Sequence, residues 1–322
     1  MPGSEAQIQI SIPKLAALLV LIVFLPCQGN AQVDSAYIIP FEQELSTGAY
    51  SYYQYTMLTH EIDNKKSIGY KPNSPAGMGV SFAYNSFSVS GGMSFDFMRD
   101  KTRGKTKAID FQYHYYGRKF IFDLFLQNYK GFYTGDNNKE PVMYPDIRLA
   151  QYGLYGQYIF NYKKFSHRAA FNQSERQLKS VGSFQLGGGF YCNRVSSDSS
   201  LVMYGKNDLN NYQLSISGGY AYIWVIKRNY HISTGMAFGF NFGFGDTRES
   251  KKVEVSPSMF PRISAGYSGD HWSLGLSFVL NRMYVAHNDE LKMFFDTGYA
   301  QIAFAWRFDT TPKFIKKIKF LN

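Results

Sequence analysis

The chain has 322 residues, an aromatic fraction of 18%, a mean hydropathy of −0.28 and a formal net charge of +10 at pH 7. This length allows a large core in one or two domains. Beyond the N-terminus no stretch approaches the roughly 20 apolar residues of a transmembrane helix, which excludes a helical membrane protein. Two all-β classes stay open: a soluble sandwich, and a barrel that shows aromatic residues to lipid and polar residues to a lumen.

The N-terminus carries the pattern of a secretory signal peptide. Lys14 precedes an apolar run over 15–25, and Pro26 and small residues follow it. The run is too short to span a membrane, so we expect cleavage after Ala31. A lipoprotein signal at Cys27 is the alternative, which Pro26 disfavours because such signals need a small residue there. The expected organisation is a signal peptide over 1–31, a short periplasmic segment over 32–47, an outer-membrane β-barrel over 48–308 and a basic periplasmic tail over 309–322.

Cleavage would leave Cys192 as the single cysteine, so no intrachain disulfide is expected. The net charge would stay at +10, since Glu5 and Lys14 cancel. A secreted chain rarely meets nucleic acid, so we expect no nucleic acid partner. The expected partners are outer-membrane lipid and lipopolysaccharide, the barrel-assembly machinery and a small solute or lipid ligand.

The first clear strand signal is FSVSGGMSFDF, over 87–97, in which apolar residues share one parity and Ser, Gly and Asp mostly share the other. A period of two is typical of a β-strand with one oily face and one wet face. A turn at 85–86 pairs Tyr84 with Phe87, and this register sends the apolar residues of both strands to one face.

The next hairpin repeats the pattern. A turn at 117–118 is expected to pair Tyr116 with Lys119, which sets His114 opposite Ile121 on the polar face. Further alternating strands are expected over 148–160, 165–171, 212–224, 230–244, 262–267, 272–281 and 297–308.

Connection lengths favour a barrel. We expect about twelve strands with tight turns near 85, 117, 162, 228 and 269. Long polar connections alternate with them, over 99–104, 131–146, 196–211, 245–257 and 284–292. Short turns at one rim and long loops at the other are typical of antiparallel up-and-down barrels of the Gram-negative outer membrane, with both mature termini in the periplasm. A soluble sandwich has no reason for this alternation or for Tyr and Trp near strand ends.

Several motifs together resemble a known family. They are YKPN (70–73), GKTK (104–107), YYGRKF (115–120), YKGFY (129–133), YPDIR (144–148), FNYKKFSHRAAFNQSERQ (160–177) and GSFQLGGGF (182–190). With them the chain resembles the Gram-negative outer-membrane family catalogued as domain of unknown function 4421. The resemblance implies a secreted barrel without an established activity.

Strand parity assigns a few charged groups to the lumen. These candidates are Asp96, Asp110, His114, Asp123, Arg168, Arg262 and Arg307. Charges of both signs in a narrow barrel usually neutralise one another. The alternative is a polar path that selects a solute as rings of charge do in pores.

The stretch from Phe165 to Val195 is too long for one strand through a core of roughly 25 Å. Its polar part, over 172–180, must therefore bulge, fold into the lumen or extend one rim. A strand irregularity is the simpler interpretation. As a functional element, the segment would form a constriction or a ligand contact through Asn172, Gln173, Ser174, Glu175 and Arg176.

A lipid- or lipopolysaccharide-modifying barrel enzyme is the competing class. Such chemistry needs a base within hydrogen-bond reach of a nucleophile. No histidine has an obvious serine at an adjacent register position, so we assign no catalytic residue, and one mature cysteine with dispersed histidines predicts no metal or cofactor.

The sequence thus favours passive transport or binding of a small solute or lipid through a polar lumen. A structural or adhesive barrel acting through its long loops is a further alternative. A continuous polar lumen would favour transport, a lumen filled by side chains would favour the structural role, and an ordered Ser-His-acid cluster would favour the enzyme.

Overall fold

The computed structural model shows an all-β fold for the unit Val33–Asn322. Among the residues it describes, no helix is long and apolar enough to cross a membrane. Asp96, the expected signal peptide and most of the basic tail lie outside the described residues. Those described are 32–43, 45–63, 66–74, 76–84, 87–95, 97, 99–135, 140–201, 203, 205–245, 253–287 and 291–309.

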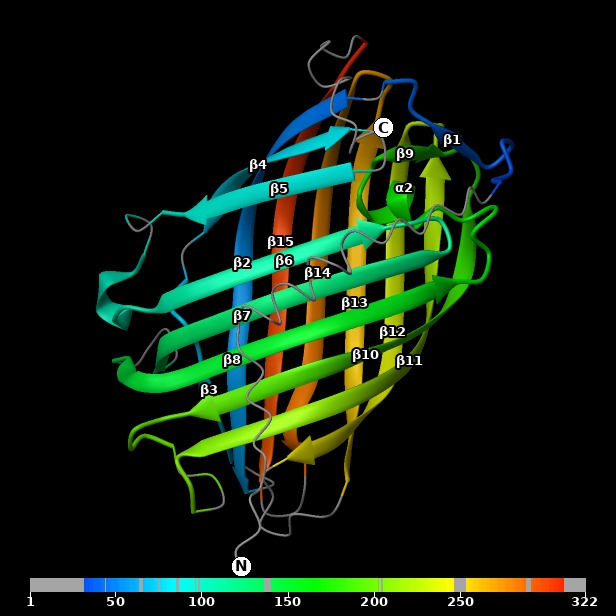
Figure 1. Cartoon of the computed structure of the whole chain (residues 1–322). Helices are drawn as coiled ribbons and strands as arrows, with labels where there is room; N and C mark the ends of the chain where they lie inside the picture. The colour runs from blue at the N-terminus through cyan, green and yellow to red at the C-terminus, as the bar shows by residue number, and fades with distance from the viewer. Residues whose placement is uncertain are drawn as a thin grey trace, which may run out of the picture. The chain divides into compact units, whose positions relative to one another are not determined.

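One antiparallel sheet of 13 strands forms the wall, in the order β5-β4-β2-β15-β14-β13-β12-β11-β10-β8-β7-β6 with β3 added to β2 (Figure 1). Apart from β3 the sheet has twelve strands, which agrees with the number expected, although the strand expected over 165–171 is not among them. The bounds are β2 Leu45–Asp63, β3 Lys66–Tyr70, β4 Gly77–Tyr84, β5 Phe87–Ser94, β6 Lys107–Tyr116, β7 Phe120–Thr134, β8 Val142–Ile159, β10 Val181–Ser196, β11 Asp208–Ile226, β12 Tyr230–Gly245, β13 Glu254–Ser268, β14 Trp272–His287 and β15 Lys292–Phe308.

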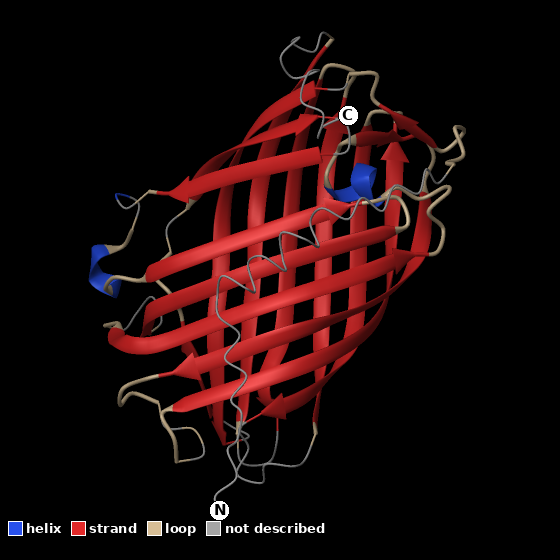
Figure 2. Cartoon of the chain, viewed as in Figure 1, coloured by secondary structure: helices blue, strands red, loops and turns tan. Residues whose placement is uncertain are grey.

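Four short elements lie near the ends of these strands (Figure 2). The strands β1 (Ile38–Pro40) and β9 (Glu175–Gln177) pair with each other in a separate two-stranded sheet. The α-helix α2 spans His167–Phe171, and the 3₁₀ turn η2 spans Lys101–Arg103.

The two faces of the wall differ as the alternation predicts. Along β12, Phe238 and Phe240 are about 60% exposed on the outside, whereas Ser233 and Asn241 are fully buried on the inside. Outward Leu, Ile, Phe, Tyr and Trp side chains continue this apolar surface over β11, β13, β14 and β15. A surface so apolar suits hydrocarbon and not water.

The strands are longer than a membrane crossing requires. β2 and β11 have 19 residues and β8 has 18, against the roughly 9–11 of a tilted membrane strand. The long connections expected over 131–146, 196–211, 245–257 and 284–292 are therefore partly wrong, because strand pairing continues into each of them.

The polarity of the inner face reverses in these extensions. At the long-loop end a single apolar cluster fills the interior, which we call the long-loop core. It joins Leu58 of β2 and Phe295 of β15 to Ile147 and Leu149 of β8, strands from well-separated parts of the wall. All four side chains are at most 1% exposed. This core closes the long-loop end of the lumen.

The wall is interrupted between β5 and β6. These strands are consecutive, yet each is an edge of the sheet, and no ladder joins them among the described residues (Figure 1). We call this gap the seam. It is closed at the long-loop end, where Lys71 and Tyr133 exchange backbone hydrogen bonds of 2.9 Å. There Asn73 also donates to the loop before β6, from its backbone N–H to the Thr106 hydroxyl at 2.8 Å and from its side-chain amide to the Gly104 carbonyl at 2.6 Å.

The predicted registers have different outcomes. Pairing of Tyr84 with Phe87 is confirmed. The expected pairing of Tyr116 with Lys119 is wrong by two residues, because Gly117 N–H donates to the Phe120 carbonyl at 2.9 Å and Tyr116 pairs with Ile121. A slip of two keeps every side chain on its face.

Candidate functional site

Side chains fill one half of the lumen. Rings meet across the interior there: Tyr155 stacks on Phe260 with centroids 5.4 Å apart, and Phe125 stacks on Tyr191 at 5.7 Å. Tyr155, Tyr191 and Phe260 belong to one buried cluster with Met283. These residues come from β7, β8, β10, β13 and β14, so we call this side the packed half.

Buried amide groups lie among the aromatic layers of the packed half. The Gln151 amide donates to Asn193 Oδ1 at 2.8 Å. Other buried amide atoms have no hydrogen-bond partner within the described part of the chain; they belong to Gln157, Gln185, Asn193, Asn211, Gln213 and Asn241. Buried polar groups are normally satisfied by protein or internal water. The packed half therefore offers several places for bound water.

The other half of the lumen is open and lies behind the seam. Ser90, Gly92 and Ser94 of β5 are exposed, although they face inward. The Tyr50 and Tyr52 rings of β2 lie over glycines of β4 and β5, where a Cβ on Gly92 would already come within about 3 Å of both side chains. We call this side, formed by β2, β4, β5 and β6, the open half.

Asp110 anchors the polar part of the open half. Its carboxylate accepts hydrogen bonds from the Gln127 amide at 2.9 Å and the Tyr129 hydroxyl at 2.7 Å, both on β7. It also accepts one from Gln54, which lies on β2 beyond the seam. Asp110 itself is exposed. An exposed carboxylate on the edge strand β6 thus contacts β2, the third strand from the other edge of the sheet.

A row of polar and aromatic groups crosses the lumen below Asp110, and we call it the transverse chain. His114 Nδ1 lies 2.6 Å from Asp123 Oδ1, a contact that the two-residue slip in register creates. The His114 ring stacks on Tyr116 with centroids 6.0 Å apart, and Tyr116 stacks on His167 at 5.5 Å. Arg262 Nη1 donates to His167 Nε2 at 3.2 Å. The transverse chain links β7 and β6 through α2 to β13.

The segment over 165–171, expected as a strand, contains the helix α2 instead. Ser166 caps this helix by accepting a hydrogen bond from Ala169 N–H at 2.9 Å, which satisfies a donor that the first turn leaves free. Arg168 therefore takes its position from the helix and not from strand parity, and its Nε donates to the Ser174 hydroxyl at 3.2 Å.

Residues 166–177, which we call the inward fold, sit inside the curl of the sheet at the short-turn end (Figures 1 and 2). α2 packs against the inner wall, where the Ser264 hydroxyl of β13 donates to the Ala170 carbonyl. The N-terminal segment holds β9 from the other side, since Ile38 pairs with Gln177 and Pro40 with Glu175. The inward fold closes the short-turn end of the lumen.

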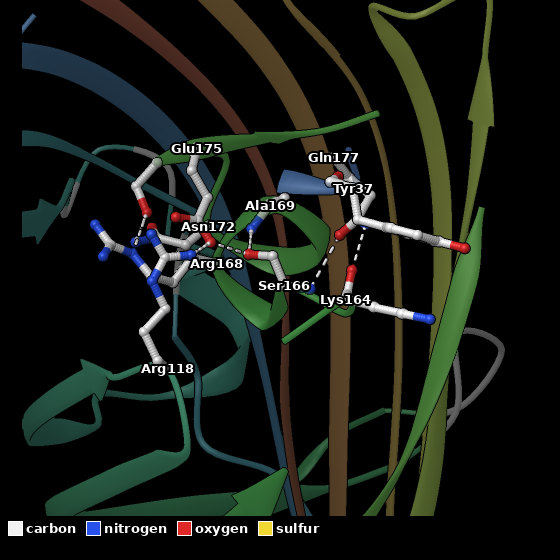
Figure 3. A network of polar contacts seen from close by, with 10 residues as sticks. Tyr37, Arg118, Lys164, Ser166, Arg168, Ala169, Asn172, Glu175 and Gln177 are labelled. Carbon is white, nitrogen blue, oxygen red and sulfur yellow. Dashed lines mark hydrogen bonds and ion pairs between the residues drawn. The ribbon is translucent and has the colours of Figure 1, made fainter. Parts of the chain in front are cut away.

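Glu175 is the charged centre of the inward fold (Figure 3). Its Oε1 accepts a hydrogen bond from Arg118 Nη1 at 2.6 Å and another from the Ser166 hydroxyl. The carboxylate is 1% exposed and the Arg118 side chain 22%. Beside it, the Gln177 amide donates to the Lys164 carbonyl at 2.7 Å and to the Tyr37 carbonyl at 3.1 Å. The ion pair of Glu175 thus connects the inward fold to the β6–β7 turn, and the amide of Gln177 connects it to the N-terminal segment.

Arg307 ties the inward fold to the last strand. Its guanidinium donates to the Gln173 carbonyl at 3.0 Å, the Gly269 carbonyl at 3.2 Å and the Ser273 hydroxyl at 3.1 Å. The same group lies 3.4 Å above the ring of Phe41. Close by, Arg176 Nη2 pairs with Asp270 at 2.8 Å, so most side chains of 172–176 contact protein and not an open lumen.

Gln173 reaches the wall only because two glycines are there. Its backbone has a positive φ of 53°, and its amide lies against the paired residues Gly266 and Gly275. We predict that Gly266→Ala displaces this amide, because the new Cβ would overlap it, and loosens the inward fold. Trypsin cleavage after Arg176 should become several-fold faster. Gly218→Ala is the control, since a Cβ there meets open space; equal rates for both variants would refute the contact.

His167 makes the inward fold sensitive to acid. Burial, and then the Arg262 guanidinium, hold the pKa of His167 well below its usual range, against the opposing charge of Asp123. The unfolded pKa is about 6.5, so below that pH the unfolded state binds more protons. The folded state therefore keeps the full stability that neutral His167 allows above about pH 6.5, and it loses stability as the pH is lowered below that value. Trypsin cleavage after Arg176 should rise between pH 7.5 and 5.5, and His167→Gln should flatten the rise; an unchanged profile would contradict this.

In the described part of the chain, His114 and His167 have no serine partner that would make a nucleophile. Within the described ranges, no serine hydroxyl is hydrogen-bonded to His114 or His167, and no three His, Cys, Asp or Glu side chains lie together as metal ligands do. Sequence patterns did not indicate Tyr116, Ser166 or Arg118 as part of the site. A cap signal at Ser166 before HRAAF was the one available sign of α2.

The outward apolar belt, the polar inner face and the meander of long tilted strands define a β-barrel of the outer-membrane type. The chain belongs to the family described as Domain of unknown function (DUF4421), which it matches over residues 32–308. No curated protein matches the chain.

Solved structures with a similar arrangement are outer-membrane proteins of low identity. The outer membrane protease OmpT from Escherichia coli has 7% identity and a TM-score of 0.39, with 85% of this chain and 100% of that chain covered. The translocator domain of the autotransporter NalP from Neisseria meningitidis has 11% identity and a TM-score of 0.43, with 82% and 88% covered. The toluene transporter TodX from P. putida has 6% identity and a TM-score of 0.27, with 83% and 91% covered.

Proposed function

We propose that this protein is a barrel of the Gram-negative outer membrane, with both mature termini in the periplasm, that binds a small solute or lipid in the open half of its lumen. The observation that carries this proposal is the contrast between the two halves. Side chains fill the packed half, whereas Gly92, Asp110 and their neighbours leave an exposed polar surface inside the wall.

Binding is favoured over free passage along the barrel axis. The long-loop core occupies one end of the lumen and the inward fold the other. A passive pore needs a continuous wet path, and in the described state both ends of such a path are filled. In the open half, the exposed Asp110 and the half-buried Gln54 provide polar groups for the head of a ligand.

A structural role is the second candidate, and the packed half favours it. The stacked rings of Tyr155 with Phe260 and Phe125 with Tyr191 resemble the interior of a barrel filled for rigidity. A purely structural barrel would retain no defined small molecule, which separates the two candidates.

The test is retention of a ligand. Protein purified from outer membranes in an uncharged detergent is washed, extracted with organic solvent and analysed by mass spectrometry. We expect one small molecule near stoichiometric amount, lost in Gly92→Leu because a side chain there would meet the Tyr50 and Tyr52 side chains at about 3 Å and push them into the open half. Gly218→Leu, which projects outward into open space, is the control. Identical extracts from both variants and wild type would refute the proposal and favour the structural role.

A further inference from the structure

A group of cationic side chains lies on the outward face of the wall, where β6, β7, β8 and β10 run side by side (Figure 1). All of them are exposed, and they are Lys107, Lys130, Arg148 and Arg194. They point outward because their strand neighbours point inward: Tyr129, Leu149 and Val195 are buried in the long-loop core. Lys107 shares this face because it pairs with Lys130. We call these four residues the cation row.

The strand register places three of these cations directly opposite one another. Lys107 pairs with Lys130 across β6 and β7, and Lys130 pairs with Arg148 across β7 and β8. Side chains at such positions have Cβ atoms about 5 Å apart, and like charges there destabilise a sheet. Arg194 follows on β10, two residues before Ser196, which is the partner of Arg148. The cation row therefore contains a repulsion that a bound anion would relieve.

Carboxylates do not neutralise the cation row as one does elsewhere on the wall. On β14 and β15, Arg282 lies directly opposite Asp296 and donates to its carboxylate at 2.7 and 2.8 Å. Among the residues described, the cation row has one ion pair, in which Arg148 lies 3.9 Å from Asp198 and both side chains are at least half exposed. Exposed pairs of this kind are weak, so the cation row keeps positive charge available for an external anion.

The cation row borders the apolar belt. Within four residues of it along the same strands, the outward side chains of Ile109, Phe111, Tyr152 and Phe190 are 37–72% exposed. In the proposed orientation the long-loop end faces away from the periplasm, which places the cation row at the level of the headgroups of the outer leaflet. A lipid there would have its acyl chains against the belt and its head against the cations.

The width of the cation row selects among anionic lipids. Neighbouring strands lie about 4.8 Å apart, so four strands carry the row over roughly 14 Å. A phospholipid head has a single phosphate and covers only part of that distance. The sugar head of lipopolysaccharide carries several phosphates on one molecule. Arginine binds phosphate through two parallel hydrogen bonds and lysine binds it as a point charge, so the side chains of the row suit such a head.

We propose that the cation row binds the phosphates of one lipopolysaccharide molecule on the outer surface of the barrel, with the acyl chains of that molecule against the apolar side chains of β6, β8 and β10. The bound phosphates relieve the repulsion between Lys107, Lys130 and Arg148. This inference uses the proposed orientation in the outer membrane, and it is independent of the ligand proposed for the open half.

Native mass spectrometry of the purified protein in an uncharged detergent tests the site, with diphosphoryl lipid A as the probe. The triple variant Lys107→Gln, Lys130→Gln and Arg148→Gln should bind lipid A about a hundredfold more weakly, since each cation close to an anionic headgroup contributes roughly fivefold. Without lipid, this variant should unfold at no lower urea concentration than wild type, because the substitutions remove repulsion. Easier unfolding would show that the protein itself already neutralises these cations and would refute the site.

The matched control removes the same charges at the short-turn end. It carries Lys163→Gln, Lys227→Gln and Arg228→Gln, and these three residues are also exposed. The control should bind lipid A as wild type does. An equal loss of affinity in both triple variants, or no loss in the first, would refute the cation row as the binding site.

Two further measurements separate the alternatives. Phosphatidylglycerol, which has one phosphate, should bind several-fold more weakly than diphosphoryl lipid A, and equal binding would refute the assignment to lipopolysaccharide. Gly92→Leu, which alters the lumen, should leave lipid A binding unchanged. If this variant loses lipid A, the lipid lies in the open half and the cation row is refuted. If wild-type extracts contain no retained molecule while the cation row binds lipid A, only the function proposed for the lumen is refuted.

Discussion

Phe295→Ala should lower the free energy of unfolding by about 4 kcal/mol, the usual cost of removing a fully buried phenylalanine. Phe295 is 1% exposed in the long-loop core and pairs directly with Leu58 across β15 and β2. The loss would identify the long-loop end as a true apolar core lying beyond the membrane belt. Urea unfolding of the protein in liposomes measures it.

The matched control for this substitution is Phe278→Ala. Phe278 lies on β14 with 46% of its surface exposed on the outer face, so its loss leaves no internal cavity and should cost about 1 kcal/mol or less. Similar midpoint shifts for the two variants would mean that the long-loop end is not packed as described.

Glu175→Ala should destabilise the inward fold by about 3 kcal/mol. The substitution leaves Arg118 without its partner at 2.6 Å and removes the acceptor of the Ser166 hydroxyl. Breaking a buried ion pair on one side usually costs about 3–5 kcal/mol, and Arg118 retains some access to water, which places the expectation at the lower end. The measurement is the denaturant dependence of trypsin cleavage after Arg176.

Asp198→Ala provides the contrast for Glu175→Ala. Asp198 pairs with Arg148 at 3.9 Å, and both side chains are at least half exposed; exposed pairs contribute about 0–1 kcal/mol. A Glu175→Ala variant no more susceptible to cleavage than Asp198→Ala would show that the ion pair does not hold the inward fold in place.

Face alternation and hairpin partners were largely predictable because local sequence determines both. The pairing of Tyr84 with Phe87 follows from one turn of two residues. The pairing of Tyr116 could not be predicted in this way. A turn of two residues and a turn of four residues after Tyr116 place every side chain on the same face, so the alternation of residues does not distinguish them. That ambiguity hid the contact between His114 and Asp123, which is the start of the transverse chain.

The inward fold could be predicted from the sequence only in part. The length of the segment after Phe165 predicts that it bulges, folds into the lumen or extends one rim, and the structure has the fold into the lumen. The alternation of SHRAAF fits a short strand as well as a helix, so α2 was missed. Pairing of Ile38 with Gln177 joins positions far apart in the chain, and no local pattern specifies such a contact.

The long loops were overestimated for a physical reason. Polar and apolar residues exchange faces where the strands leave the membrane: Lys130 and Arg148 are exposed beside buried Tyr129 and Leu149. The pattern of outward apolar residues therefore ends at the membrane boundary, although the strands continue beyond it around the long-loop core.

Single-channel conductance of the folded, membrane-inserted wild type tests the central claim most directly. Because the long-loop core and the inward fold close the two ends of the lumen, we predict electrical silence in planar bilayers from protein whose heat-modifiable mobility shows that it is folded. Discrete conductance steps that change ion selectivity in Asp123→Ala or Arg307→Ala would contradict the closed lumen and establish an open, charge-lined pore.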